Sequence, residues 1–189
     1  IGLLDRVGLG YVILGQEQQS LSDGEHYRLL LAKAFSSGLT DVIYLLEDPL
    51  AGIHPEDAPC LLAVIKKLVT NHNTVIVTDR EGSLAEHADY LLHLGPEPGP
   101  NGGYLLSTSA LKQSQPVLCN TRSSEETPQL SVSVSTSMIQ IENLAFPLQR
   151  LSTISGVSGS GKTTLLNSIY EHAALFLKRI LLYSQKLFF

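Results

Sequence analysis

Uninterrupted apolar runs alternate with amphipathic segments over residues 1–112. Residues 42–46 and 74–78 are apolar runs of the kind found in strands buried on both faces. Between them, residues 57–70 carry apolar side chains at helical spacing and predict an amphipathic helix. Shorter segments predict a helix at 84–88 and strands at 90–94 and 104–106. This order predicts an α/β fold with a parallel sheet.

A further helix is expected to start near the N-terminus of this half. Ser22 is a favourable N-cap residue, and Glu25 follows it by three positions, which is the pattern of a capping box. Apolar residues then continue to Ala34. Taken alone, the segment is better explained as an ordinary capped amphipathic helix, because capping boxes are common.

A change of composition divides the chain. Residues 113–137 are rich in Ser, Thr, Gln and Pro and predict a linker. The segment 138–189 then restarts the pattern with expected strands at 138–142 and 151–155 and a helix from Thr164. We therefore expect two partial α/β units, 1–112 and 138–189, joined by this linker.

The second unit contains a phosphate-binding pattern. Residues 156–163 read Gly-Val-Ser-Gly-Ser-Gly-Lys-Thr, the G-x-x-x-x-G-K-[ST] spacing of a P-loop between a strand and a helix. Glycines let successive backbone N–H groups point at phosphate oxygens, and the helix dipole adds to them. Lys162 is expected to reach the β- and γ-phosphates, and the Thr163 hydroxyl to bind Mg²⁺. The predicted nucleotide-binding residues are Gly156, Ser158, Gly159, Ser160, Gly161, Lys162, Thr163 and Thr164. The alternative is a Gly/Ser-rich turn without ligand.

Charged side chains follow two of the expected strands in the first unit. Glu47 and Asp48 end one strand, and Arg80 lies between two acids at the end of the next. The carboxyl ends of parallel strands are where open α/β sheets bind ligands. In most P-loop proteins such an acidic strand lies downstream of the P-loop, whereas here it lies upstream. The chain is thus expected to hold the rear of one nucleotide-binding domain and the front of another.

Composition narrows the remaining possibilities. The net charge of −5 argues against a broad nucleic-acid-binding surface on this chain alone. Cys60 and Cys119 stand far apart, and we expect a buried small residue and a loop thiol, with no zinc site and no disulfide framework. This cysteine usage suits a reducing, cytoplasmic compartment. No apolar run approaches a membrane span, and the start at Ile1 suggests a fragment of a longer protein.

Several stretches together resemble one family. Residues 21–25 (Leu-Ser-Asp-Gly-Glu) are similar to the ABC signature L-S-G-G-[QE], and residues 45–49 (Leu-Leu-Glu-Asp-Pro) to the Walker B stretch L-D-E-P. Supporting similarities lie at residues 7–11, 52–55, 73–77, 88–90, 94–96 and 156–162. Within the ABC ATPases the match is to the UvrA family of nucleotide excision repair. It covers residues 3–112 and 138–170.

The resemblance implies a function and an assignment of site residues. It implies ATP and Mg²⁺ as ligands, recognition of damaged DNA, a UvrB-like partner, homodimerisation and a remainder of the same chain beyond this span. In ABC proteins ATP lies between one domain's P-loop and another's signature. Accordingly the P-loop here would share a site with Ser22, Asp23, Gly24 and Glu25. Glu47, Asp48 and Arg80 would be catalytic positions of the other site, and Glu47 would also bind the Mg²⁺ of that site.

Three changes in the motifs depart from the family pattern. Asp23 replaces a signature glycine and would oppose a γ-phosphate; the Glu47–Asp48 order is inverted; and Arg80 replaces the switch histidine. Arg binds phosphate well but does not relay a proton. The changes predict slow or absent hydrolysis, unless they are harmless drift. Besides a UvrA-like repair protein, a catalytically degenerate module that regulates assembly of a partner ABC protein is possible. An ABC protein of resistance or transport is the third alternative.

Overall fold

The computed structural model describes residues 2–13, 15, 21–106, 128–136, 139–176 and 180–183. Most of the expected linker, with Cys119, and the last six residues lie outside this part. The helices are α1 (Gly2–Arg6), α2 (Asp23–Ser36), α3 (Ala58–Thr70) and α4 (Lys162–Phe176), with 3₁₀ turns η2 (Ala85–His87) and η3 (Gly99–Asn101). The strands are β1 (Ile43–Glu47), β2 (Thr74–Asp79), β3 (Tyr90–Gly95), β4 (Tyr104–Leu106), β5 (Gln129–Ser135), β6 (Gln140–Pro147), β7 (Leu151–Gly156) and β8 (Ile180–Tyr183).

One six-stranded sheet organises the described residues, in the order β4-β3-β7-β2-β1-β8. All neighbouring pairs are parallel except β3 with β4, which is antiparallel. β7, which leads into the P-loop, is inserted between β2 and β3, with Thr78 opposite Ile154 and Leu92 opposite Ile154 on the other side. Strands from both sides of the expected linker therefore belong to the same sheet, whereas the sequence suggested that each half had its own.

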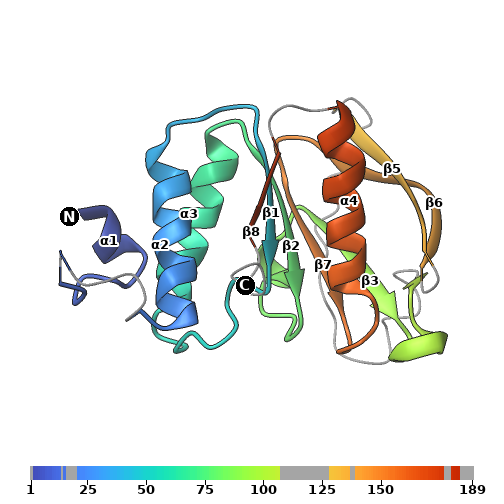
Figure 1. Cartoon of the computed structure of the whole chain (residues 1–189), viewed down its shortest axis with the longest axis horizontal. Helices are drawn as coiled ribbons and strands as arrows, with labels where there is room; N and C mark the ends of the chain where they lie inside the picture. The colour runs from blue at the N-terminus through green and yellow to red at the C-terminus, as the bar shows by residue number, and fades with distance from the viewer. Residues whose placement is uncertain are drawn as a thin grey trace.

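Side chains that alternate along the strands of the sheet belong to two hydrophobic clusters, one on each face. Tyr44 and Leu46 of β1 pack with α2 and α3 on one face, while Ile43 and Leu45 pack with α4 on the other. Figure 1 shows this layering, with α2 and α3 on one side of the strands and α4 on the opposite side. The burial of both faces explains why β1, β2 and β7 are buried at every position.

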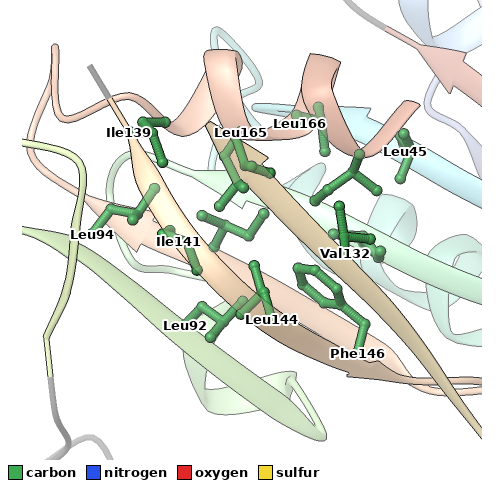
Figure 2. Packing of buried hydrophobic residues seen from close by; sticks show 14 of the residues in the cluster. Leu45, Leu92, Leu94, Val132, Ile139, Ile141, Leu144, Phe146, Leu165 and Leu166 are labelled. Atoms are coloured by element: carbon green, nitrogen blue, oxygen red, sulfur yellow. The ribbon is translucent and has the colours of Figure 1, made fainter. Parts of the chain in front are cut away.

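A two-stranded hairpin of β5 and β6 covers the α4 face. Val132, Leu144 and Phe146 from the hairpin meet Leu165 and Leu166 of α4 and Leu92 of β3, as Figure 2 shows. β5 is not predicted from the sequence, because its Ser-rich composition places it in the expected linker. Its alternation of Leu or Val with Ser over residues 130–135 is the period-2 pattern of a half-buried strand.

Several local predictions are confirmed and two are corrected. Ser22 caps α2, and its capping box with Glu25 is formed. The expected helix at 84–88 is only the 3₁₀ turn η2. Cys60, expected to be buried, is exposed. The reason is that the buried stripe of α3 consists of Leu61, Val64, Ile65 and Leu68, and position 60 falls beside it. None of the helices in the described ranges is long and apolar enough to cross a membrane.

Candidate nucleotide-binding site

The P-loop forms a tight turn between β7 and α4. Gly156, Gly159 and Gly161 have φ values of 145°, 79° and 97°, which side-chain-bearing residues rarely adopt. A Cβ atom at Gly156 would lie 2.1 Å from the Leu94 carbonyl oxygen, so the loop also needs glycine there for space. α4 starts at Lys162, and its first-turn N–H groups are therefore oriented towards the loop.

Lys162 is held inside the curve of this loop. Its Nζ donates to the carbonyl oxygens of Gly156 at 2.7 Å and Val157 at 2.9 Å, and the residue is buried. Burial lowers the pKa of Lys162; Arg80 lowers it further, while Asp48 and Asp79 oppose that shift. An ammonium group has three N–H donors. With two directed at the loop, one remains for an incoming oxygen ligand.

The two acidic residues at the end of β1 lie beside the P-loop. The Thr163 hydroxyl donates to Glu47 Oε1 at 2.5 Å. Asp48 accepts from Arg80, with Nη2 to Oδ2 at 3.1 Å. The structure thus differs from the sequence analysis, which assigned Glu47, Asp48 and Arg80 to another site. The physical reason is the sheet order: β7 joins the sheet that contains β1 and β2, so their carboxyl ends meet at one edge.

A cavity of about 230 Å³ lies between the P-loop and the Asp48–Arg80 ion pair. It is lined by Asp48, Arg80, Ser158, Gly159, Gly161, Lys162, Thr163 and Thr164. A second cavity of about 210 Å³, on the side of residues 49–52 and 81–84, also includes Asp48 and Arg80 in its lining. The Asp48–Arg80 ion pair therefore borders both spaces. Of the predicted P-loop residues, Gly156 and Ser160 do not line this cavity, and Ser160 is buried.

Two further residues, which the sequence analysis did not assign, hold Asp48 and Arg80 in place. Thr78 accepts the Asp48 N–H at both its carbonyl oxygen and its hydroxyl, at 3.1 and 3.0 Å. Asp79 accepts the N–H groups of Glu81, Gly82 and Leu84, which closes the turn that carries Arg80. An Asp followed by Arg-Glu-Gly is a typical turn sequence, so this turn could have been predicted from the sequence.

The residues of the signature-like stretch lie in a different place. Ser22 and Glu25 bond each other, and Glu25 Oε1 also accepts the Tyr11 hydroxyl at 2.6 Å. That hydrogen bond is the largest cause that lowers the pKa of Glu25. Neither residue lines the cavity next to Lys162, nor does Gly24, and the Asp23 side chain is outside the described part of the structure. Within one chain, then, the structure does not bring the signature and the P-loop together.

The donors present suit a magnesium-bound polyphosphate. Glycine-shaped backbone, a buried ammonium, and a hydroxyl beside a carboxylate are oxygen- and phosphate-binding groups. Asp48 Oδ1 is buried and has no hydrogen-bond partner among the described residues, so a polar ligand or water would satisfy it. No cluster of three or more His, Cys, Asp or Glu residues that could hold a metal by themselves occurs in the described ranges.

Comparison with known proteins gives a consistent family of relatives. No protein-family profile matches the chain. UvrABC system protein A of Chlamydia trachomatis serovar D is 95% identical over 179 residues, which cover 95% of this chain and 10% of that protein. The protein of the same name from Chlamydia muridarum is 72% identical over 178 residues, which cover 94% of this chain and 10% of that protein. That of Helicobacter pylori strain ATCC 700392 / 26695 is 32% identical over 176 residues, which cover 85% of this chain and 19% of that protein.

A solved structure agrees with these sequence matches. The crystal structure of UvrA2 from Deinococcus radiodurans aligns with a TM-score of 0.55 and 31% sequence identity, covering 92% of this chain and 23% of that one. The chain is therefore similar to UvrA proteins along nearly its whole length. It spans about a tenth of the length of the chlamydial relatives.

Proposed function

We propose that this chain, whose sequence is UvrA-like along nearly its whole length, binds ATP with Mg²⁺ at the P-loop and contributes that site to a nucleotide excision repair protein. The observation that carries the proposal is the convergence of Lys162, Thr163 and Glu47 at the end of the sheet, beside a cavity. Recognition of damaged DNA, a UvrB-like partner, homodimerisation and a cytoplasmic location belong to the proposal through the relatives.

The proposed roles follow from the donors that each residue offers. Lys162 and the N–H groups at the start of α4 would hold phosphate oxygens. Thr163 and Glu47 would hold Mg²⁺, directly or through water, since hydroxyl and carboxylate oxygens are its usual protein ligands. Bound Mg²⁺ would neutralise phosphate charge and favour phosphoryl transfer. Glu47 is then proposed to act at the P-loop of its own chain.

Asp48 and Arg80 are the proposed water-positioning and γ-phosphate-contacting groups. Their ion pair at 3.1 Å ties up one oxygen of Asp48. A general base must come within about 2.6–3.2 Å of the water it activates, or act through one further water. Asp is one methylene shorter than the Glu that the family pattern places here, so we propose that hydrolysis is slow.

The signature residues are proposed to act on a nucleotide held elsewhere. Because Ser22, Gly24 and Glu25 do not line the cavity at Lys162, they would need a second nucleotide-binding unit facing them. That unit would be the remainder of a longer chain or a second copy. Ser22 and the first N–H groups of α2 would then meet a γ-phosphate, with Asp23 opposing it by charge repulsion.

A second candidate function is a nucleotide-binding module that regulates assembly without turning over ATP. The observation that favours it is the Asp48–Arg80 ion pair, because the guanidinium already occupies one carboxylate oxygen that would otherwise be free to bind an attacking water. Measured ATP turnover separates the two candidates. A resistance or transport ABC protein is not favoured, since the relatives are UvrA proteins.

The experiment that tests nucleotide binding is a titration of the chain with a fluorescent ATP analogue and Mg²⁺. Lys162→Ala should abolish binding, because it removes the buried ammonium that the loop positions. Lys67→Ala is the matched control, since Lys67 lies on α3 away from the cavity, where its ammonium stacks on Phe35. Equal affinity of Lys162→Ala and the unmodified chain would remove the assignment.

A further inference from the structure

A segment outside the P-loop motif packs directly against it. Residues 96–103, here called the brace segment, connect β3 to β4 and include η3. The Gly99 N–H donates to the Gly159 carbonyl oxygen at 3.1 Å, and the Gly103 N–H donates to the Ser160 carbonyl oxygen at 3.1 Å. The brace segment thus satisfies two consecutive carbonyl groups on the outer side of the phosphate-binding loop.

Contact between the two loops leaves little spare room. A Cβ added at Gly159 would lie 3.0 Å from Pro98 Cβ. A Cβ at Gly102 would lie 3.2 Å from Ser160 Cα and 2.6 Å from the Glu97 carbonyl oxygen. Real Cβ atoms essentially never approach another heavy atom within 3.0 Å. Gly102 is therefore wedged between the backbone of its own segment and the backbone of the P-loop.

The requirement for glycine at position 102 is steric. Gly102 has φ −91° and ψ −169°, an extended conformation that any residue adopts. Alanine there would carry no penalty from its backbone angles, so its whole effect would come from displacing the neighbouring chains. This distinguishes Gly102 from Gly156, Gly159 and Gly161, whose positive φ values require glycine in any case.

We propose that the brace segment sets the conformation of the P-loop, with Gly102 as the positioning residue. The inference rests on the proposed nucleotide binding, and deepens it. A glycine-rich loop loses much conformational freedom when it closes around phosphate. A brace that fixes the Gly159 and Ser160 carbonyls beforehand removes part of that cost, so the loop binds phosphate more tightly.

The test compares Gly102→Ala with Gly2→Ala in the full 189-residue chain. Gly2 lies on a helix, and a Cβ there meets nothing within 4 Å, so it is the control for adding a methyl group. Amide hydrogen exchange over residues 156–163 is measured without nucleotide, and affinity for fluorescent ATP with Mg²⁺ is measured separately. Gly102→Ala should speed exchange in the P-loop and weaken binding on the order of tenfold. Gly2→Ala should change neither.

The outcomes separate the inference from the proposed function. If the unmodified chain binds no nucleotide, the proposed function fails, and hydrogen exchange alone then decides whether the brace exists. If Gly102→Ala leaves P-loop exchange unchanged, the brace is refuted whatever the affinity. Thermal unfolding of each variant shows whether it folds. Should Gly102→Ala not fold, Pro98→Gly, which removes the Cβ atom that faces Gly159, must produce the faster P-loop exchange or the inference is wrong.

Discussion

Glu47 and Asp48 are consecutive residues with different surroundings. Glu47 ends β1, is buried and accepts the Thr163 hydroxyl. Asp48 leaves the strand with φ 41°, in the left-handed region, and faces Arg80. Asp tolerates that region better than most residues, and strained backbone of this kind is common at functional sites. The inverted order therefore places the longer side chain at the hydroxyl of the P-loop and the shorter one at the cavity.

Exchanging the two carboxylates should raise ATP hydrolysis. In the double variant Glu47→Asp with Asp48→Glu, the longer side chain at position 48 reaches further into the cavity, towards an attacking water. We expect turnover to rise several-fold, as measured by phosphate release with Mg²⁺. If the pair served a site whose P-loop is elsewhere, as the family resemblance implied, the exchange would produce no gain in this chain.

The control for this exchange is the same double variant carrying Lys162→Ala. It should release no phosphate above background, which shows that any gain arises at this P-loop. Turnover that is unchanged by the exchange would contradict the placement of Asp48 as the water-positioning group, and would favour the regulatory module instead.

At the scale of elements, a polar contact links β3 to β7 just below the P-loop. His93 Nδ1 lies 2.8 Å from Ser155 Oγ, and Ser155 also lies within 3.4 Å of the Leu92 carbonyl oxygen. Burial lowers the pKa of His93 below its ordinary value of 6.5, and the charge of Lys162 lowers it further. The two strands are therefore best held together when His93 is neutral.

This contact predicts acid sensitivity of the fold. Because the folded-state pKa of His93 is lowered, the unfolded chain binds more protons than the folded chain as the pH falls through 6.5. The free energy of unfolding should therefore decrease as the pH falls below about 6.5 and level off under the lowered pKa. Urea unfolding at a series of pH values measures it.

Replacing the histidine isolates its contribution. His93→Gln should flatten the pH dependence below about 6.5, and His87→Gln, at an exposed position of η2, is the control for removing a histidine. An equally steep dependence in His93→Gln would show that other groups cause the acid sensitivity.

Elements with a strong local signal could be predicted from sequence. The apolar runs gave β1 and β2, and the Ser22–Glu25 spacing gave the start of α2. β5 and β8 were missed: Ser-rich composition concealed the alternation in β5, and charged neighbours concealed the apolar residues of β8. β8 also pairs with β1, a strand distant in the sequence, and such tertiary pairing overrides local preference.

At the scale of the whole molecule, the position of β7 decides the site. Its residues are buried at every position, so its pattern equally suits the start of a new sheet or the centre of an existing one. The structure inserts it between β2 and β3. The sequence predicted the chemistry of Lys162, Thr163, Glu47 and Asp48. It did not predict that these residues lie in one site, because the spacing of apolar residues does not determine the order of strands in a sheet.

The magnesium dependence of ATP binding in Glu47→Gln tests most directly whether Glu47 and the P-loop form one site. The variant removes the charge beside Thr163 and keeps the shape of the side chain. ATP affinity in the presence of Mg²⁺ should fall about tenfold or more, as expected for losing a charged partner, while affinity without Mg²⁺ should not fall. Glu56→Gln, at an exposed side chain, is the control. Unchanged Mg²⁺-dependent affinity in Glu47→Gln would place Glu47 at another site and contradict the single-sheet account.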